Sequence, residues 1–302
     1  MDHQYFVVQK WKAITQSLSL ALLLFFIAPS VCALDPGIYL SQYGHTAWRV
    51  RDGYFSSAPL AITQTTDGRL WIGGESGLLQ FDGVRFVPWK PPDSTPLPDN
   101  RIFGLLGTRD GSLWIGTHQG LARWKDNQLT VYTKYGRFAA LLEDRNGGVW
   151  AGHTRSLDKL PPLCHFAEDQ FKCFATPGNG YLLYVGSLHE DRSGNIWVGA
   201  AGAVCRWQET NPDCYAIPGQ AAPTERFGVW ALAGDADGDL WVDGGPSGIW
   251  RLASGHWQSY QLADLKLQTQ AMLYDRENSL WIGYKARAYK ESQWKNGPLH
   301  RR

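Results

Sequence analysis

Residues 68–78, "GRLWIGGESGL", place a tryptophan among apolar and small residues and close on a turn that contains glycine. The same phrase recurs five times, as GSLWIGTHQGL around Trp114, GGVWAGHTRSL around Trp150, GNIWVGAAGAV around Trp197, GDLWVDGGPSGI around Trp241 and NSLWIGY around Trp281. Successive tryptophans, counted from Trp71, are 43, 36, 47, 44 and 40 residues apart. A sequence period of about forty residues is typical of stacked β units. We therefore expect one repeat array to fill most of the 302-residue chain.

One repeat, residues 101–133, shows what each unit contains. Short apolar stretches at 102–107, 113–117, 121–124 and 129–132 alternate with turns rich in Gly, Asp and Asn. Four short antiparallel strands joined by tight turns form one blade of a β-propeller. The sequence predicts an all-β fold, a β-propeller of about six four-stranded blades or an incomplete seven-bladed ring.

The repeated tryptophans are predicted to have a structural role. Blades of a propeller pack face to face, so the gap between neighbours needs bulky apolar side chains, while the glycines that follow let the backbones approach closely. We assign this interblade packing to Trp71, Trp114, Trp150, Trp197, Trp241 and Trp281.

Four aspartates, Asp144, Asp191, Asp235 and Asp275, each precede a repeat tryptophan by six residues. Residues 235–239, "DADGD", resemble part of a calcium loop, but the glutamate that would close such a loop is missing. Aspartate in a turn commonly accepts hydrogen bonds from its own backbone. We predict that these side chains cap their turns, and we expect no metal and no cofactor.

Four cysteines form two evenly spaced pairs. Cys164 and Cys173, like Cys205 and Cys214, are separated by eight residues that span a turn between two strand-like stretches. This arrangement suits two hairpin disulfides, which an exported chain would form. A zinc site would require cysteines closer together in sequence than these are.

The N-terminus has a different character from the repeats. Lys10 and Lys12 precede an apolar run at 18–27, and Val31 and Ala33 occupy the −3 and −1 positions of a cleavage site. This pattern predicts a signal peptide at 1–33 and a periplasmic or secreted protein. Two alternatives remain open: an uncleaved segment that tethers the protein to the membrane, and a lipoprotein signal at Cys32. The net charge is +1 without a basic run, so we expect no nucleic-acid partner.

The remaining chain divides into three predicted parts. They are an N-terminal segment at 34–58, propeller repeats at 59–284 and an irregular C-terminal tail at 285–302. Residues 46–50 could provide a strand that closes the ring by completing blade six. Otherwise the chain would be a fragment of five to six blades that pairs with further blades or with a second copy, because an open ring exposes strand edges.

One face of the predicted propeller carries the candidate binding residues. Arg101 and Arg137 each lie thirteen residues before a repeat tryptophan, near the mouth of the central channel. Loops on a rigid scaffold are where binding residues usually gather. We expect a ring on this face to hold a small-molecule ligand, anionic or glycan-like, through charge-assisted hydrogen bonds. Its other members are Glu75, His118, His153 and Arg155.

The aligned repeats, of the form D-x-x-G-x-L-W-I-G-T-x-x-G-L-x-R, resemble those of the two-component regulator propeller family, and residues 40–89 resemble the start of its members. That family forms the extracytoplasmic sensor region of bacterial hybrid histidine kinases and related diguanylate cyclases. The resemblance implies a noncatalytic periplasmic ligand-sensing propeller of a two-component-type receptor, present as a truncated or partial sensor. Two departures from the pattern are Arg155 in blade three and Asp243 in blade five, where glycine is expected.

A secreted propeller enzyme is the alternative. The repeats are also similar in period and tryptophan use to those of streptogramin lyases. Lyase chemistry would need a histidine and an acid that converge at the channel mouth. His118 and Glu75 are the nearest candidate pair.

Overall fold

The computed structural model describes residues 48, 50–91, 95–133, 136–154, 161–174, 182–220, 228–260, 268–275 and 279–285. The chain divides into two compact units, Met1–Tyr43 and Gly44–Arg302, and all of these residues belong to the second. The predicted signal peptide lies outside the described residues, as do residues 286–302 of the predicted tail. Within the described ranges, no helix has the length and apolar character needed to cross a membrane.

The described residues form five four-stranded antiparallel sheets and one two-stranded sheet, each built from strands that are consecutive in the chain. The first sheet consists of β1 (Pro59–Gln64), β2 (Leu70–Gly74), β3 (Gly77–Phe81) and β4 (Phe86–Pro88). The second consists of β5 (Ile102–Gly107), β6 (Leu113–Thr117), β7 (Gly120–Lys125) and β8 (Gln128–Thr133). The third consists of β9 (Phe138–Glu143), β10 (Val149–His153), β11 (Leu163–Ala167) and β12 (Gln170–Phe174). The fourth consists of β13 (Ser187–Glu190), β14 (Ile196–Gly199), β15 (Ala203–Arg206) and β16 (Asp213–Ala216). The fifth consists of β17 (Leu232–Gly234), β18 (Leu240–Asp243), β19 (Ile249–Ala253) and β20 (His256–Tyr260). The two-stranded sheet consists of β21 (Gln268–Tyr274) and β22 (Leu280–Lys285). Two single-turn 3-10 helices, η2 (Val50–Asp52) and η3 (Gly245–Ser247), accompany the strands.

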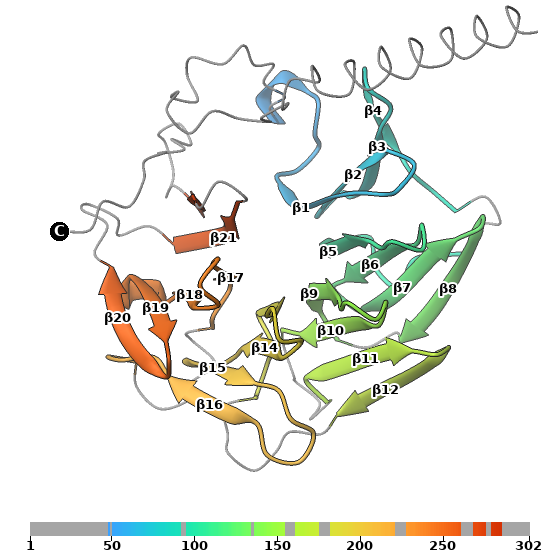
Figure 1. The fold of residues 1–302 in the computed structure, drawn as a ribbon. Coiled ribbons are helices and arrows are strands. Elements are labelled where there is room, and N and C mark those ends of the chain that lie inside the picture. Colours follow the sequence, from blue (N-terminus) through green and yellow to red (C-terminus); the bar gives the residue numbers. More distant parts are fainter. Residues whose placement is uncertain are drawn as a thin grey trace, which may run out of the picture. The chain divides into compact units, whose positions relative to one another are not determined.

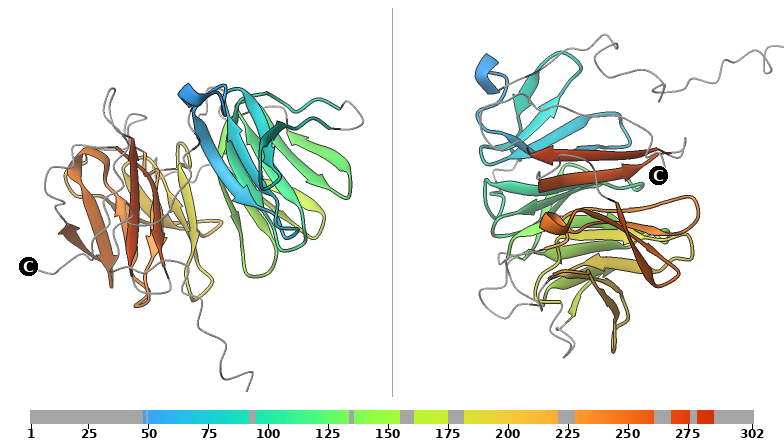
Figure 2. Two further views of the ribbon diagram at one scale, coloured as in Figure 1. Left: turned by 90° about the horizontal axis from the view of Figure 1, so that it is seen from above. Right: turned by 90° about the vertical axis from the view of Figure 1, so that its left-hand side faces the viewer.

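The first strands of successive sheets contact one another in chain order, from β1 with β5 to β17 with β21. Figure 1 shows these strands innermost in their sheets, which follow the chain around a common centre. In the two views of Figure 2 the sheets stand next to one another as separate layers. This arrangement confirms the predicted all-β propeller, and we number its sheets as blades one to six.

The hydrophobic core lies between neighbouring blades. Trp71 of blade one shares a cluster with Leu113 and Ile115 of blade two. The corresponding tryptophans of blades two, three and five belong to clusters that include residues of the following blade. The buried indoles are those of Trp71, Trp114, Trp150 and Trp241, and the half-buried ones are those of Trp197 and Trp281. The tryptophans of blades one to five therefore pack against the following blade.

The aspartate six residues before the tryptophan connects the first turn of a blade to this core. In blade three, Oδ1 of Asp144 accepts the backbone N–H groups of Asn146 and Gly148, each at 2.9 Å. Its Oδ2 accepts the Nε1–H of Trp150 at 2.9 Å. The same indole hydrogen bond forms in the three following blades. The aspartates cap their turns as predicted, and each also fixes the tryptophan that packs between blades.

The glycine two residues after the tryptophan is required by the approach of the next blade. A Cβ added at Gly73 would lie 2.4 Å from Cγ2 of Ile102. Blade five has Asp243 at this position, and its side chain is buried, with the residue only 1% exposed. Oδ1 of the carboxylate accepts the N–H of Gly245 at 2.9 Å, and Thr269 on β21 interacts with the same carboxylate. Blade five therefore meets blade six through a buried polar contact.

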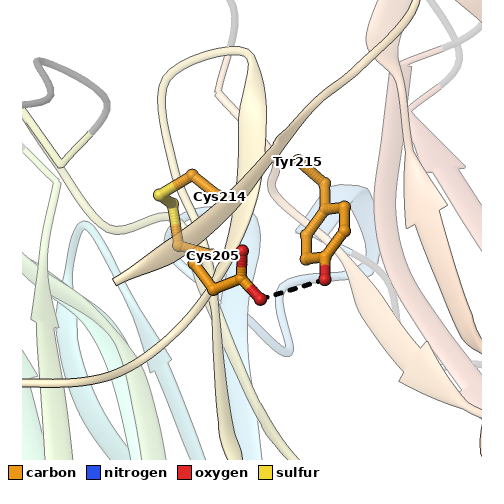
Figure 3. The surroundings of a disulfide bond; sticks show 4 residues. Cys205, Cys214 and Tyr215 are labelled. Atoms are coloured by element: carbon orange, nitrogen blue, oxygen red, sulfur yellow. Dashed lines mark hydrogen bonds between the residues drawn. A yellow bond between two sulfur atoms is a disulfide. The ribbon is translucent and has the colours of Figure 1, made fainter. Parts of the chain in front are cut away.

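Both predicted disulfides are present. Cys164 and Cys173 lie directly opposite each other on β11 and β12, and Cys205 and Cys214 do so on β15 and β16, with Cα atoms 4.0 Å apart in each pair. Figure 3 shows the second bridge together with the next residue, Tyr215, whose hydroxyl donates to Asp213 at 3.0 Å. Each bridge links the two outer strands of one blade, so the pairing expected from the spacing is confirmed.

Blades one and six expose large apolar side chains on their first strands. β1 exposes Leu60 and Ile62, and β21 exposes Leu273, which is 63% accessible. Of residues 46–50 the structure describes Trp48 and Val50, and the Trp48 ring contacts Phe81 and Phe86 of blade one at 5.4 and 5.7 Å between centroids. Ring closure through residues 46–50 remains a prediction.

Candidate functional site

Two arginines precede the first strands of blades two and three at equivalent positions. The carbonyl of Arg101 accepts the N–H of His118 at 2.9 Å, and the carbonyl of Arg137 accepts the N–H of Thr154 at 2.8 Å. Each arginine therefore lies beside the residue that directly follows the second strand of its own blade. The common distance of thirteen residues to a tryptophan predicts this equivalence, and the two arginines lie at the same end of their sheets.

Arg101 lies between a carboxylate and an imidazole. Its Nε donates to Oδ1 of Asp99 at 3.1 Å and its Nη2 donates to Oδ2 at 2.9 Å. Nη2 also lies 2.9 Å from Nδ1 of His118. The hydrogen bonds between the two side chains raise the pKa of Arg101 and lower the pKa of Asp99, so this pair is ionised at neutral pH.

The contact between Arg101 and His118 fixes the tautomer of the imidazole. A guanidinium group has hydrogen-bond donors and no acceptor. Nδ1 of His118 must therefore accept from Nη2 of Arg101, which places the ring hydrogen of neutral His118 on Nε2. His118 thus carries an N–H donor on the side of its ring away from Arg101.

Phe103 connects the two arginine positions. The guanidinium carbon of Arg137 lies 5.0 Å from the centroid of the Phe103 ring, within the range of a cation–π contact. The Phe103 and His118 rings are 5.9 Å apart between centroids. Nε of Arg137 also donates to Oγ1 of Thr154 at 2.6 Å. These contacts define a continuous group that we call the mouth cluster: Asp99, Arg101, Phe103, His118, Arg137 and Thr154.

The mouth cluster carries two guanidinium groups and one carboxylate. Asp99 is only 12% exposed at its side chain, whereas the Arg101 side chain is 42% exposed. Asp99 is therefore buried in its ion pair with Arg101, while part of the Arg101 side chain stays accessible to a ligand. Charge-assisted hydrogen bonds to carboxylates or phosphates are the interaction that such a group makes best. The aromatic face of Phe103 adds an apolar surface beside these donors.

The remaining predicted binding residues lie outside this group. Glu75 is exposed, and its charge contributes to the raised pKa of Arg101. A hollow of about 210 Å³ is lined in part by Gly74, Ser76 and Asn100, which are the sequence neighbours of Glu75 and Arg101. Glu75 therefore lies close enough to Arg101 to influence the charge of the mouth cluster.

His153 is placed differently from His118. It is 1% exposed, and its ring packs against Phe138 in an edge contact of 5.5 Å between centroids. A Cβ added at Gly136 would lie 1.9 Å from Nε2 of His153, so this glycine is required by the position of the ring. His153 therefore has a packing role within blade three, and Arg155 lies outside the described residues.

Three members of the mouth cluster were not identified from the sequence. Thr154 is four residues after Trp150, as His118 is four residues after Trp114, so equal spacing was the available signal. Asp99 accepts the backbone N–H of Arg101 at 2.8 Å, a local turn contact that an Asp two residues ahead commonly makes. No feature of the repeat phrase indicates a role for Phe103.

The described part of the chain contains no group of three His, Cys, Asp or Glu side chains arranged to hold a metal ion.

The repeat around Trp114 is similar to the repeats of a known family. Residues 96–119 match the family described as "Two component regulator propeller". The resemblance seen in the repeat phrase is thereby confirmed for the repeat that contains Arg101 and His118. No curated protein matches the sequence at a significant level.

Several solved structures share the fold at low sequence identity. Virginiamycin B lyase from Staphylococcus aureus is 18% identical, with a TM-score of 0.61 over 76% of this chain and 78% of that one. PorZ from Porphyromonas gingivalis is 13% identical, with a TM-score of 0.54 over 74% of this chain and 37% of that one. The extracellular domain of a hybrid two component system from B. thetaiotaomicron is 18% identical, with a TM-score of 0.49 over 80% of this chain and 39% of that one. Virginiamycin B lyase and PorZ, whose TM-scores are 0.61 and 0.54, therefore share this fold although they are proteins of different kinds.

Proposed function

We propose that this chain is a noncatalytic ligand-binding propeller from the extracytoplasmic part of a two-component-type signalling receptor. Its ligand is a small anionic or glycan-like molecule held by the mouth cluster. The observation that carries the proposal is the contact chain from Asp99 through Arg101 and His118 to Phe103 and Arg137.

Two further observations support this function. The repeat that carries Arg101 and His118 matches the two component regulator propeller family. Two disulfides within single blades suit an oxidising compartment, which favours a periplasmic or secreted location. A receptor of this kind would pass the ligand signal to a partner domain, a second copy or further blades.

Calorimetric titration with glucuronate and glucose tests the proposal. The two sugars differ in the carboxylate that the mouth cluster would recognise, so we expect glucuronate to bind and glucose to bind at least about tenfold more weakly. Arg101→Ala and Arg137→Ala should each weaken glucuronate binding by at least about tenfold. Arg85→Ala is the matched control, because Arg85 lies in the outer hairpin of blade one with a 79% exposed side chain. Equal affinities of the wild type and both mouth variants for glucuronate would contradict the proposal.

A lyase remains the second candidate function because the fold is similar to that of virginiamycin B lyase. The acid nearest His118 in the mouth cluster is Asp99, whose Oδ2 lies 3.9 Å from Nδ1, rather than Glu75. Asp99 is engaged with Arg101, and Nδ1 of His118 accepts from the same guanidinium, which leaves neither group as an obvious base. Turnover of virginiamycin B by the purified protein, lost in His118→Ala, would favour the lyase over the sensor.

A further inference from the structure

At the strand ends opposite the mouth cluster, a row of arginines connects neighbouring blades. Arg109 follows the first strand of blade two and contacts Glu143, the last residue of β9 in blade three. Its backbone N–H donates to Oε2 at 3.0 Å, and its Nε lies 3.2 Å from Oε1. Its guanidinium also donates to the carbonyl of Asp144. We call this arrangement of an arginine with the terminal glutamate of the next blade an interblade clamp.

The next interface repeats the clamp. Arg145 of blade three donates from its backbone N–H to Oε2 of Glu190 at 2.7 Å and from Nε to Oε1 of the same carboxylate. Glu190 ends β13 in blade four, as Glu143 ends β9 in blade three. Nη2 of Arg145 reaches the carbonyl of Asp191 at 2.7 Å. The same clamp therefore forms at two successive interfaces, and in both the carboxylate belongs to the last residue of the next blade's first strand.

The interface between blades four and five has the arginine but lacks a glutamate at the end of the next blade's first strand. Arg192 occupies the equivalent position in blade four, whereas β17 of blade five ends at Gly234. Among the described residues, neither the backbone N–H nor the guanidinium of Arg192 has a hydrogen-bond acceptor. A hollow of about 270 Å³ opens at this place, and Arg192 and Gly234 are part of its wall.

The other acids around the hollow already have partners. Glu190 is engaged by Arg145, and Asp191 accepts the Nε1–H of Trp197 at 2.9 Å. Asp235 and Asp239 lie 2.8 and 2.9 Å from Nη2 of the buried Arg251. Asp275, on blade six, accepts the indole N–H of its own repeat tryptophan. Asp191 and Asp275 are thus held by neutral N–H donors, and Arg192 is the cation of the wall that has no ion-pair partner among the described residues.

The hollow also presents two neutral polar groups. His189 and Tyr274 line it, and neither side chain makes a hydrogen bond to another described residue. Burial lowers the pKa of His189, so its ring is neutral at pH 7. A Cβ added at Gly234 would lie 2.3 Å from Nε2 of His189, so the ring takes the space that a side chain at 234 would need.

We propose that this hollow binds a small organic acid, whose carboxylate takes the position that Glu143 and Glu190 hold in the two preceding interfaces. The carboxylate would accept from the backbone N–H and from Nε of Arg192. The volume leaves room for a ligand of several heavy atoms, with hydroxyl groups facing His189 and Tyr274. This site is separate from the mouth cluster and does not depend on the function proposed for it.

Acetate is the simplest probe, and the ring-proton resonance of His189 is the readout. At constant ionic strength, with chloride as the replaced anion, acetate should shift this resonance saturably in the wild-type protein. Arg192→Ala should weaken acetate binding by at least about tenfold, since charge-assisted hydrogen bonds are among the stronger contacts that a site can lose. Arg69→Ala is the control and should bind acetate as the wild type does, because Arg69 is an exposed arginine in the equivalent turn of blade one.

Two results would overturn the proposal. A non-saturating shift that chloride reproduces would show that the hollow has no affinity for carboxylates, and an unchanged affinity in Arg192→Ala would show that the arginine does not hold them. A capped Gly-Glu-Gly peptide separates a free acid from an acidic side chain of a protein partner. Binding of the peptide at least about tenfold tighter than that of acetate would assign the hollow to a protein partner and contradict a small-acid site.

Discussion

The substitution Asp243→Asn should stabilise the protein at neutral pH and leave it unchanged in acid. Burial raises the pKa of Asp243 from 3.8 to about 6, and hydrogen bonds from Gly245 and Thr269 offset only part of this effect. Below pH 3.8 the carboxyl is protonated in both the folded and the unfolded chain, so its ionisation has no effect on stability there. Between pH 3.8 and about 6 the unfolded chain releases the proton while the folded chain keeps it, and the free energy of unfolding falls as pH rises.

The magnitude follows from the difference between the two pKa values. A difference of about two pKa units corresponds to about 3 kcal/mol. This cost is fully present above pH 6 and absent below pH 3.8. The asparagine keeps an acceptor oxygen for the N–H of Gly245 but must also bury an amide N–H₂ group. We therefore expect a gain of about 1 to 3 kcal/mol at pH 7.5 and no gain at pH 4.

Urea denaturation of the wild type and the variant, in half-unit steps from pH 4 to pH 8, measures this difference. The informative quantity is the change in unfolding free energy between the two proteins as a function of pH, at an unchanged denaturant slope. Asp126→Asn is the control, because Asp126 lies in an exposed turn between β7 and β8. A stability difference for Asp243→Asn that is the same at pH 4 and pH 7.5 would refute the assignment of a buried, raised pKa to this residue.

Three further predictions concern the packing of the blades. Trp114→Ala should lower the free energy of unfolding by about 3 to 5 kcal/mol, and Trp257→Ala, in an outer hairpin, by clearly less; equal shifts in urea midpoint would contradict interblade packing of Trp114. Replacing Cys205 and Cys214 together by serine should cost about 2 to 3 kcal/mol because the nine-residue loop is no longer closed, and an unchanged melting temperature would argue against it. Asp144→Ala should cost at least about 2 kcal/mol, since it removes the acceptor of two backbone N–H groups and of a buried indole N–H; fast amide exchange confined to that turn, without loss of global stability, would limit its role to the turn itself.

The sequence predicts the blades well because the repeat phrase carries the information that a blade needs. The tryptophan, the small residues after it and the polar turns specify strand lengths and contacts within about forty residues. The cysteine spacing likewise predicts Cys164–Cys173, because a tight hairpin places residues at that separation opposite each other. These features are local, and local patterns can be recognised in a single sequence.

Contacts within the site were harder to predict because they depend on small differences in register. His153 and Thr154 are neighbours, yet Thr154 holds Arg137 at the mouth while His153 is buried beside Phe138. A shift of one residue along a strand moves a side chain to the other face of the sheet. The absence of an interblade clamp at Gly234 could not be predicted from the sequence, because it is recognised only by comparison with the clamps of the two preceding interfaces.

The most direct test of the central claim is to observe the guanidinium groups of the mouth cluster while an anionic sugar is added. In ¹⁵N-labelled protein, glucuronate should shift the Nε–Hε resonances of Arg101 and Arg137 saturably and with one common affinity. The resonance of the exposed Arg85 should stay in place under the same conditions. Unchanged Arg101 and Arg137 resonances, or an equal and non-saturating shift of all three arginines, would contradict ligand binding at the mouth of this propeller.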